Sequence, residues 1–103
     1  MLVCGMERDE ILNVLRLHEA ALQARGIMHA ALFGSRARGD AGPDSDTDIL
    51  IELDPTRRVG LYEFVGIART VSELFDGKVD VMEPEGMKPH IRARAVADAI
   101  YAF

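Results

Sequence analysis

The sequence has a single cysteine, no excess of basic residues and no long apolar run, and each of these features argues against a class of protein. Cys4 is the single cysteine, so the chain forms no internal disulfide, which favours a reducing, cytoplasmic location. No apolar run reaches the roughly 18–20 residues that a helix needs to span a bilayer, and the first residues lack the basic and apolar regions of a signal peptide. The net charge of −5 disfavours a general nucleic-acid binder, since such proteins usually carry a basic surface.

The composition that remains is that of a folded globular protein. The chain has 103 residues, of which 49% are hydrophobic and 28% are charged, and both fractions are ordinary for a globular domain. This length predicts one domain, spanning residues 1–103.

Apolar periodicity predicts four helical segments and three strands. In chain order these are a helix over 7–25, a strand over 27–33, a helical turn over 35–38, a strand over 46–53, a helix over 61–75, a strand over 78–82 and a helix over 89–103. The order predicts an α/β or α+β fold, in which helices pack on a small mixed sheet.

Three of these segments carry patterns that say which residues should face the core. In the strand over 46–53, Ile49, Ile51 and Leu53 alternate with the other residues and should share one face. The later helices carry apolar stripes at helical spacing. The stripe of the helix over 61–75 comprises Leu61, Phe64, Val65, Ala68, Val71, Leu74 and Phe75, and that of the last helix comprises Ile91, Ala95, Val96, Ala99, Ile100 and Phe103.

The segment that follows the first strand, Phe33-Gly34-Ser35-Arg36-Ala37-Arg38-Gly39-Asp40, has the chemistry of a phosphate-binding turn. Gly34 lets the backbone approach a ligand closely because it has no side chain. Ser35 and Arg36 supply a hydroxyl and a guanidinium that suit phosphate oxygens, and a helical turn here would direct free N–H groups at an anion. Arg36 is the preferred nucleotide contact, whereas Arg38 is equally compatible with a solvated surface charge.

Asp46 and Asp48 open the next strand and form a pair of carboxylates. At positions i and i+2 of a strand they point to the same face, with Cα atoms roughly 6–7 Å apart. Such a pair repels itself unless a cation lies nearby, and Mg²⁺ is the oxygen-seeking cation that brings substrate phosphates with it. The alternative is plain turn chemistry, because Pro43-Asp44-Ser45-Asp46 is also a favourable turn sequence.

Asp80 is the candidate for a third carboxylate. It lies between Val79 and Val81 in the strand over 78–82, and a carboxylate buried there without a partner is costly. A metal ion shared with the aspartate pair on a neighbouring strand would remove that cost. The alternative is an edge strand in which Asp80 faces water, paired with Lys78 or an arginine.

Taken together, Phe33-Gly34-Ser35, a gap of ten residues and Asp46-Thr47-Asp48-Ile49 resemble the signature of the DNA polymerase beta nucleotidyltransferase superfamily. The extended form GSRARGDAGPDSDTDILIELD is similar to the minimal nucleotidyltransferases, and the resemblance covers nearly the whole chain. Thr47 is a departure, since the superfamily often has an apolar residue between the two aspartates.

The resemblance implies roles for individual residues. Asp46, Asp48 and Asp80 match the family's catalytic, metal-binding carboxylates, which hold two Mg²⁺ ions. Gly34, Ser35 and Arg36 match the turn that binds ATP, the nucleotide substrate. The family also implies a partner, because minimal nucleotidyltransferases are commonly the antitoxins of HEPN-domain toxins. In several such pairs the antitoxin transfers AMP from ATP to a tyrosine of the HEPN ribonuclease.

The sequence therefore supports an enzyme that AMPylates a partner toxin, and two alternatives remain. One is an antitoxin that acts by binding alone; the other is a subunit of a split small-molecule nucleotidyltransferase. A domain of this size does not enclose a second substrate, so we expect the acceptor to come from another protein or across an oligomer interface.

Overall fold

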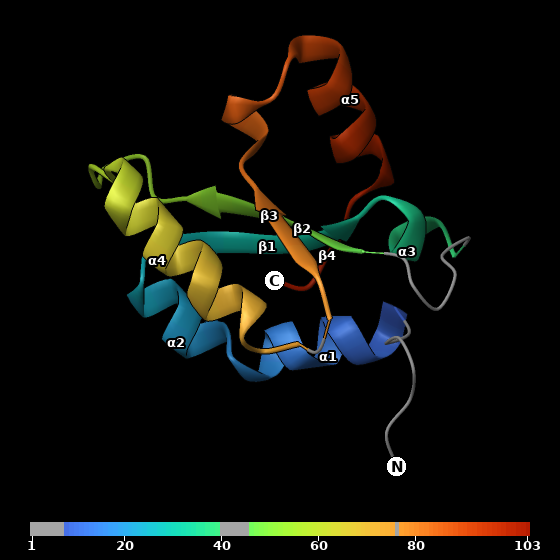
Figure 1. The fold of residues 1–103 in the computed structure, drawn as a ribbon, viewed down its shortest axis with the longest axis horizontal. Coiled ribbons are helices and arrows are strands. Elements are labelled where there is room, and N and C mark those ends of the chain that lie inside the picture. Colours follow the sequence, from blue (N-terminus) through green and yellow to red (C-terminus); the bar gives the residue numbers. More distant parts are fainter. Residues whose placement is uncertain (1–7, 40–45, 76) are drawn as a thin grey trace.

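A four-stranded mixed sheet with helices on both sides forms the frame of the molecule (Figure 1). The computed structural model describes residues 8–39, 46–75 and 77–103. Glu7, Cys4 and the turn sequence Pro43-Asp44-Ser45 lie outside the described residues. No helix in the described ranges has the length and apolar character that crossing a membrane demands.

The strands lie in the order β3-β2-β1-β4. Their bounds are Ile27–Phe33 for β1, Thr47–Leu53 for β2, Val79–Met82 for β3 and Ile100–Tyr101 for β4. Strand β1 pairs antiparallel with both β2 and β4, whereas β2 and β3 are parallel. The parallel pair requires a crossover connection, which α4 provides. The prediction of a small mixed sheet with packed helices is confirmed.

One face of the sheet packs on the first helices and on α4. The predicted helix over 7–25 is two helices, α1 (Arg8–Leu17) and α2 (Glu19–Ala24), which meet at His18. The buried core joins these helices and α4 (Leu61–Ser72) to the sheet; it includes Ile11, Leu15, Leu22, Ile27, Leu32, Ile49, Ile51, Ile67 and Val71. The predicted alternation of β2 is confirmed, since Ile49 and Ile51 are fully buried and Leu53 packs against them.

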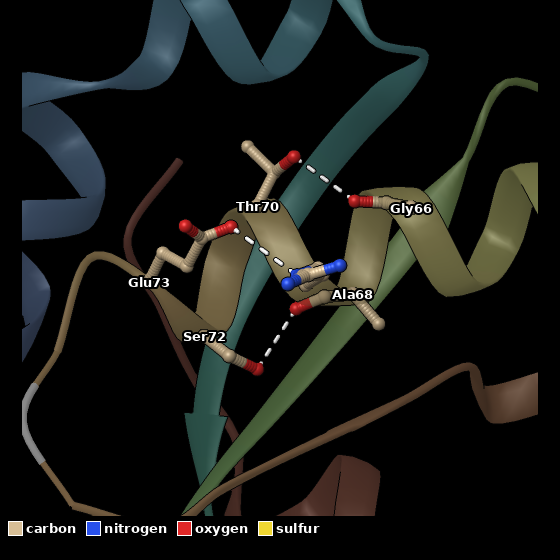
Figure 2. Close-up of polar contacts among 6 residues, drawn as sticks. Gly66, Ala68, Thr70, Ser72 and Glu73 are labelled. Atoms are coloured by element: carbon tan, nitrogen blue, oxygen red, sulfur yellow. Dashed lines mark hydrogen bonds and ion pairs between the residues drawn. The ribbon is translucent and has the colours of Figure 1, made fainter.

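The apolar stripe predicted for α4 is partly wrong. Leu61 is 76% exposed and Val65 is 55% exposed, whereas Ile67, which the stripe omitted, is buried with Val71. The helix ends at Ser72 and not at Phe75. Its last turns hold Thr70 and Ser72, whose hydroxyls donate to the carbonyls of Gly66 and Ala68 (Figure 2). Each hydroxyl thus finds its hydrogen-bond acceptor one turn earlier in the same helix.

The last segment differs most from the prediction. Instead of one helix over 89–103, α5 covers Pro89–Asp98 and a short strand, β4, follows it. Helix α5 lies on the opposite side of the sheet from α1 and α2 (Figure 1). It buries Ala95, as predicted, but leaves Ile91 and Val96 about half exposed, so the predicted apolar face is partly wrong. A 3₁₀ turn, η1 (Pro84–Gly86), lies between β3 and α5.

The phenol of Tyr101, on β4, forms a hydrogen bond with Glu52 on β2. This bond predicts that the phenol of Tyr101 titrates at an unusually high pH. Its hydroxyl donates to Glu52 Oε2 at 2.7 Å. This hydrogen bond, followed by burial, raises the pKa of Tyr101 from 10.0 to about 12. Because the folded pKa exceeds the unfolded one, the stabilisation is complete below about pH 10 and is lost as the pH rises toward 12.

We therefore expect the phenolate absorbance of a Tyr62→Phe variant, in which Tyr101 is the remaining tyrosine, to appear near pH 12. Adding Glu52→Gln should move the transition toward 10, since the acceptor loses its negative charge. A transition near pH 10 in Tyr62→Phe alone, with circular dichroism showing an intact fold, would contradict the hydrogen bond.

Candidate active site

The sheet topology brings three distant segments to one edge. Strand β1 ends where its antiparallel partner β2 begins, so Phe33 lies opposite Asp48. Strand β3 begins beside β2 because the two are parallel, and Asp48 therefore lies opposite Asp80. Neighbouring strands are about 4.8 Å apart, so the turn after β1 and these two carboxylates meet at the same edge.

Gly34 forms the junction between β1 and the short helical turn α3 (Ser35–Arg38). Its φ of +77° lies in the region that favours glycine. A Cβ atom at this position would collide with Oδ2 of Asp48. The sequence predicted that Gly34 lets the backbone approach a ligand. In the structure the backbone at Gly34 closely approaches the carboxylate of Asp48.

Asp48 is half-buried among other charges. Burial raises the pKa of its carboxyl above the usual 3.8, and the neighbouring Asp80 and Asp46 carboxylates raise it further. The guanidinium groups of Arg38 and Arg36 act in the opposite direction. The three predicted carboxylates thus lie within range of electrostatic interaction, and the resulting mutual repulsion is the condition under which a bound cation is favourable.

Both arginines of the turn act on the carboxylate edge. The sequence favoured Arg36 as the phosphate contact, and in the structure the guanidinium groups of Arg38 and of Arg36 both lower the pKa of Asp48. Ser35 and Arg36 are both half-buried on α3, whereas Arg38 is exposed. Both arginines direct positive charge at the carboxylate edge, so Arg38 joins the candidate site.

Asp46 and Thr47 are placed by the start of β2. Asp46 precedes the strand, and its Oδ2 lies 3.6 Å from Nζ of Lys78. Strand β3 is an edge strand, as the alternative for Asp80 required, but the amine of Lys78 lies against Asp46 and not against Asp80. Thr47 faces the core side and is only 5% exposed, so it occupies the buried position where the superfamily often has an apolar residue.

The donor chemistry of this edge fits Mg²⁺, because the groups are carboxylates and the cation prefers oxygen ligands. The mutual repulsion at Asp48 gives a divalent cation an electrostatic reason to bind there. In residues 8–39, 46–75 and 77–103, however, no three His, Cys, Asp or Glu side chains are arranged as a ligand set. Asp46 in particular is turned to Lys78 and would exchange the amine for a metal ion.

Two residues that sequence reasoning missed hold the turn in place. Arg8 Nη1 on α1 donates to the carbonyl of Ala37 at 3.1 Å. Arg38 Nη1 forms an ion pair with Oδ2 of Asp98, on the last turn of α5, also at 3.1 Å. Sequence separations of 29 and 60 residues hide both contacts from any local pattern.

A cavity of about 660 Å³ lies at the other end of the strands and shares none of the site residues. It is lined by residues from the start of β1, the end of β2 and the segment around η1, among them Met28, Glu52, Pro55, Val59 and Glu83. The pKa of Glu83 is raised by burial and by the neighbouring Glu85. This acidic cavity is therefore separate from the edge that carries Asp48 and Asp80.

Comparison with known proteins agrees with this geometry. The profile of the nucleotidyltransferase domain family matches residues 15–102. The protein adenylyltransferase MntA of Thermococcus cleftensis is 29% identical over 94 residues, which is 90% of this chain and 93% of that protein. A solved minimal nucleotidyltransferase superposes with a TM-score of 0.67 at 28% identity, covering 93% of this chain and 96% of that one.

A toxin–antitoxin solved with AMP-PNP shares the fold, with a TM-score of 0.66 at 16% identity over 85% of this chain and 72% of the other. The family match spans most of the present chain, including β1, the turn and all three aspartates. The chain therefore belongs to the nucleotidyltransferase domain family and, within it, to the minimal nucleotidyltransferases.

Proposed function

We propose that this chain is an Mg²⁺-dependent adenylyltransferase antitoxin, which transfers AMP from ATP to a tyrosine hydroxyl of a HEPN-domain toxin. The observation that carries the proposal is the pairing of Asp48 with Asp80 beside the Gly34 turn. It brings a carboxylate pair and a phosphate-binding turn to one edge of the sheet. The relative named as an adenylyltransferase supports the reaction, and the toxin–antitoxin structure with AMP-PNP supports the partner and the nucleotide.

The proposed reaction follows from the charges at this edge. Asp46, Asp48 and Asp80 would hold Mg²⁺, which supplies Lewis-acid stabilisation of the charge that develops on the phosphate oxygens. Ser35, together with the arginines of α3, binds the β- and γ-phosphates and orients the α-phosphate.

Asp80, on the neighbouring strand, accepts the proton of the incoming tyrosine hydroxyl. The new bond joins the tyrosine oxygen to the α-phosphorus, and the bond to the β-phosphate oxygen breaks. Pyrophosphate leaves, and the toxin carries AMP on its tyrosine.

The test is to incubate the chain with its cognate HEPN toxin, Mg²⁺ and ATP labelled at the α-phosphate. We expect label on the toxin and, in parallel, loss of its ribonuclease activity. ATP labelled at the γ-phosphate should leave the toxin unlabelled, which separates AMP transfer from phosphorylation. A chelator should abolish labelling and added Mg²⁺ should restore it.

Neutralisation by binding alone is the second candidate, and the ion pair between Lys78 and Asp46 favours it because an amine there competes with a metal ion. In the same experiment this candidate gives a tight complex and a silent ribonuclease, but no label with either form of ATP. That result would refute the proposal that the chain is an adenylyltransferase. Label on the toxin that disappears in Asp48→Asn would refute binding alone.

A further inference from the structure

The turn α3 is too short to fix its own position. It has four residues, and the bond from Arg38 N–H to the carbonyl of Gly34 closes a single turn. Isolated helices of this length are unstable in water. Ala37 is buried at 4% exposure, which anchors one side of the turn. The remaining contacts decide where the side chains of the turn lie relative to Asp48.

Two of those contacts come from helices near opposite ends of the chain. Arg8, on the first helix, donates to the Ala37 carbonyl and so holds the backbone of the turn. Asp98, on the last helix, pairs with the Arg38 guanidinium and so holds a side chain. Because one contact constrains the backbone of the turn and the other constrains the Arg38 side chain, we expect them to have different effects on nucleotide binding.

Arg38 links one carboxylate to the turn that lies against another. Its guanidinium pairs with Asp98 at 3.1 Å, and its backbone N–H donates to the carbonyl of Gly34, the residue that packs against Oδ2 of Asp48. The Arg38 side chain is 46% exposed, whereas that of Asp98 is 28% exposed and sits on the longer helix. A long exposed arginine has many rotamers, and a fixed carboxylate selects among them.

We propose that Asp98 is a positioning residue for nucleotide binding: it orients Arg38 toward the triphosphate, with Arg8 supporting the backbone of the same turn. The inference rests on the proposed function, because it takes the turn to be the phosphate site. A guanidinium serves a carboxylate and a phosphate at once, since it carries several N–H donors in a fixed fork. Exposed ion pairs add little to stability, so the value of this pair lies in orientation.

Substitutions at Asp98 separate orientation from charge. Removing a charge-assisted hydrogen bond should weaken binding of a fluorescent ATP analogue by about three- to tenfold in Asp98→Ala. Asp98→Asn should bind almost as wild type does, because the amide oxygen still accepts a bond from Arg38. In transfer assays the Asp98→Ala variant should raise KM for ATP and leave kcat unchanged.

A double-variant comparison tests whether Asp98 acts through Arg38. In an Arg38→Ala background, Asp98→Ala should cause no further loss of affinity. The matched control is Glu73→Ala, which removes the partner of Arg69 from another exposed ion pair, on α4 (Figure 2), and should leave nucleotide binding unchanged. Thermal unfolding of each variant confirms that the fold is retained.

Four results would overturn the proposal. Tighter nucleotide binding in Asp98→Ala would show that Asp98 competes with phosphate for Arg38. If Asp98→Asn and Asp98→Ala lost the same affinity for nucleotide, Asp98 would act through its charge and not through orientation of Arg38. If Asp98→Ala lost as much affinity in the Arg38→Ala background as in the wild type, Asp98 would act independently of Arg38. Wild-type nucleotide binding by Asp98→Ala would show that Asp98 has no role in binding.

The two proposals fail separately. If the wild type binds nucleotide but transfers no AMP to the toxin, the proposed function fails while the Asp98 comparison still stands. If Asp98→Ala transfers AMP with an unchanged KM, the inference about Asp98 fails and the function stands.

Discussion

Asp48→Asn is expected to lower the rate of AMP transfer by about two to three orders of magnitude, the loss typical for removing one electrostatic group from a transition-state site. Asparagine keeps the shape of the side chain but not the charge that holds Mg²⁺. Asp80→Asn should cause a loss of similar size, because Asp80 lies opposite Asp48 across the parallel pair. The measurement is single-turnover labelling of the toxin with α-labelled ATP.

The same substitution should not destabilise the metal-free protein at neutral pH. The folded pKa of Asp48 is raised above its ordinary 3.8 by burial, Asp80 and Asp46, so folding favours the protonated form. The stability that this shift contributes is present at low pH and is lost as the pH rises through the folded pKa. At pH 7 the charged carboxylate is therefore a cost that asparagine avoids, and the variant should melt at or above the wild-type Tm.

The stability comparison has a pH signature and a matched control. The difference in Tm should vanish as the pH falls below 3.8, where Asp48 is neutral in both states. Asp54→Asn serves as the control, because hydrogen bonds from Thr56 lower the pKa of Asp54, the opposite direction. That variant should be no more stable than wild type at pH 7 and should transfer AMP normally.

Mg²⁺ should raise the Tm of the wild type and not that of Asp48→Asn, since a cation that binds the native state stabilises it. Transfer at the wild-type rate by Asp48→Asn would show that the metal carboxylates are misassigned. A marked fall in its Tm at neutral pH would show that the charge of Asp48 is compensated in the folded state.

The part of this fold that the sequence predicted is the part with strong local patterns. The alternation of Ile49, Ile51 and Leu53 places the core face of β2 correctly, because a strand has a period of two whatever it packs against. The motif from Gly34 to Asp48 is likewise local, and the glycine is required by a close contact within that motif.

The errors arise where tertiary packing decides. Helix α5 and strand β4 were predicted as one helix because Ala99, Ile100 and Phe103 continue a helical spacing by chance. Pairing of Ile100 with Leu32 and of Tyr101 with Ala31 draws these residues into the sheet instead. In α4, Leu61 and Val65 match the periodicity as well as Val71 does. Only the face of the helix that carries Ile67 and Val71 is buried, however.

The candidate site divides in the same way. Residue types and spacing were enough to propose the three aspartates as candidates, but nothing in the sequence shows that Lys78 lies against Asp46, because only the parallel pairing of β2 and β3 brings them together. The contacts that Arg8 and Asp98 make with α3 are equally hidden, because both residues come from distant helices. These are consequences of topology and not of local sequence.

Gly34→Ala is expected to reduce AMP transfer by about a hundredfold while the protein still folds. The added Cβ collides with Oδ2 of Asp48, an atom at the free end of a short side chain. Rotation of that carboxylate relieves the collision, so the fold survives, but a metal ligand is displaced, and a displacement of roughly 1 Å at a reacting centre can cost about a hundredfold in rate. The backbone at Gly34, with φ +77° and ψ −152°, lies in a region that is essentially confined to glycine, so the substitution should also lower stability by about 1–3 kcal/mol.

Gly77→Ala separates the collision from the strain. Gly77 has nearly the same φ, +83°, but no described atom lies within 4 Å of an added Cβ. Both variants should therefore lose stability in denaturant unfolding, because both place a side chain at a positive φ, while Gly34→Ala alone loses transfer. If Gly77→Ala reduced transfer equally, backbone strain would explain the loss at both positions. If Gly34→Ala transferred AMP normally, the contact between the turn and Asp48 would have no part in the reaction.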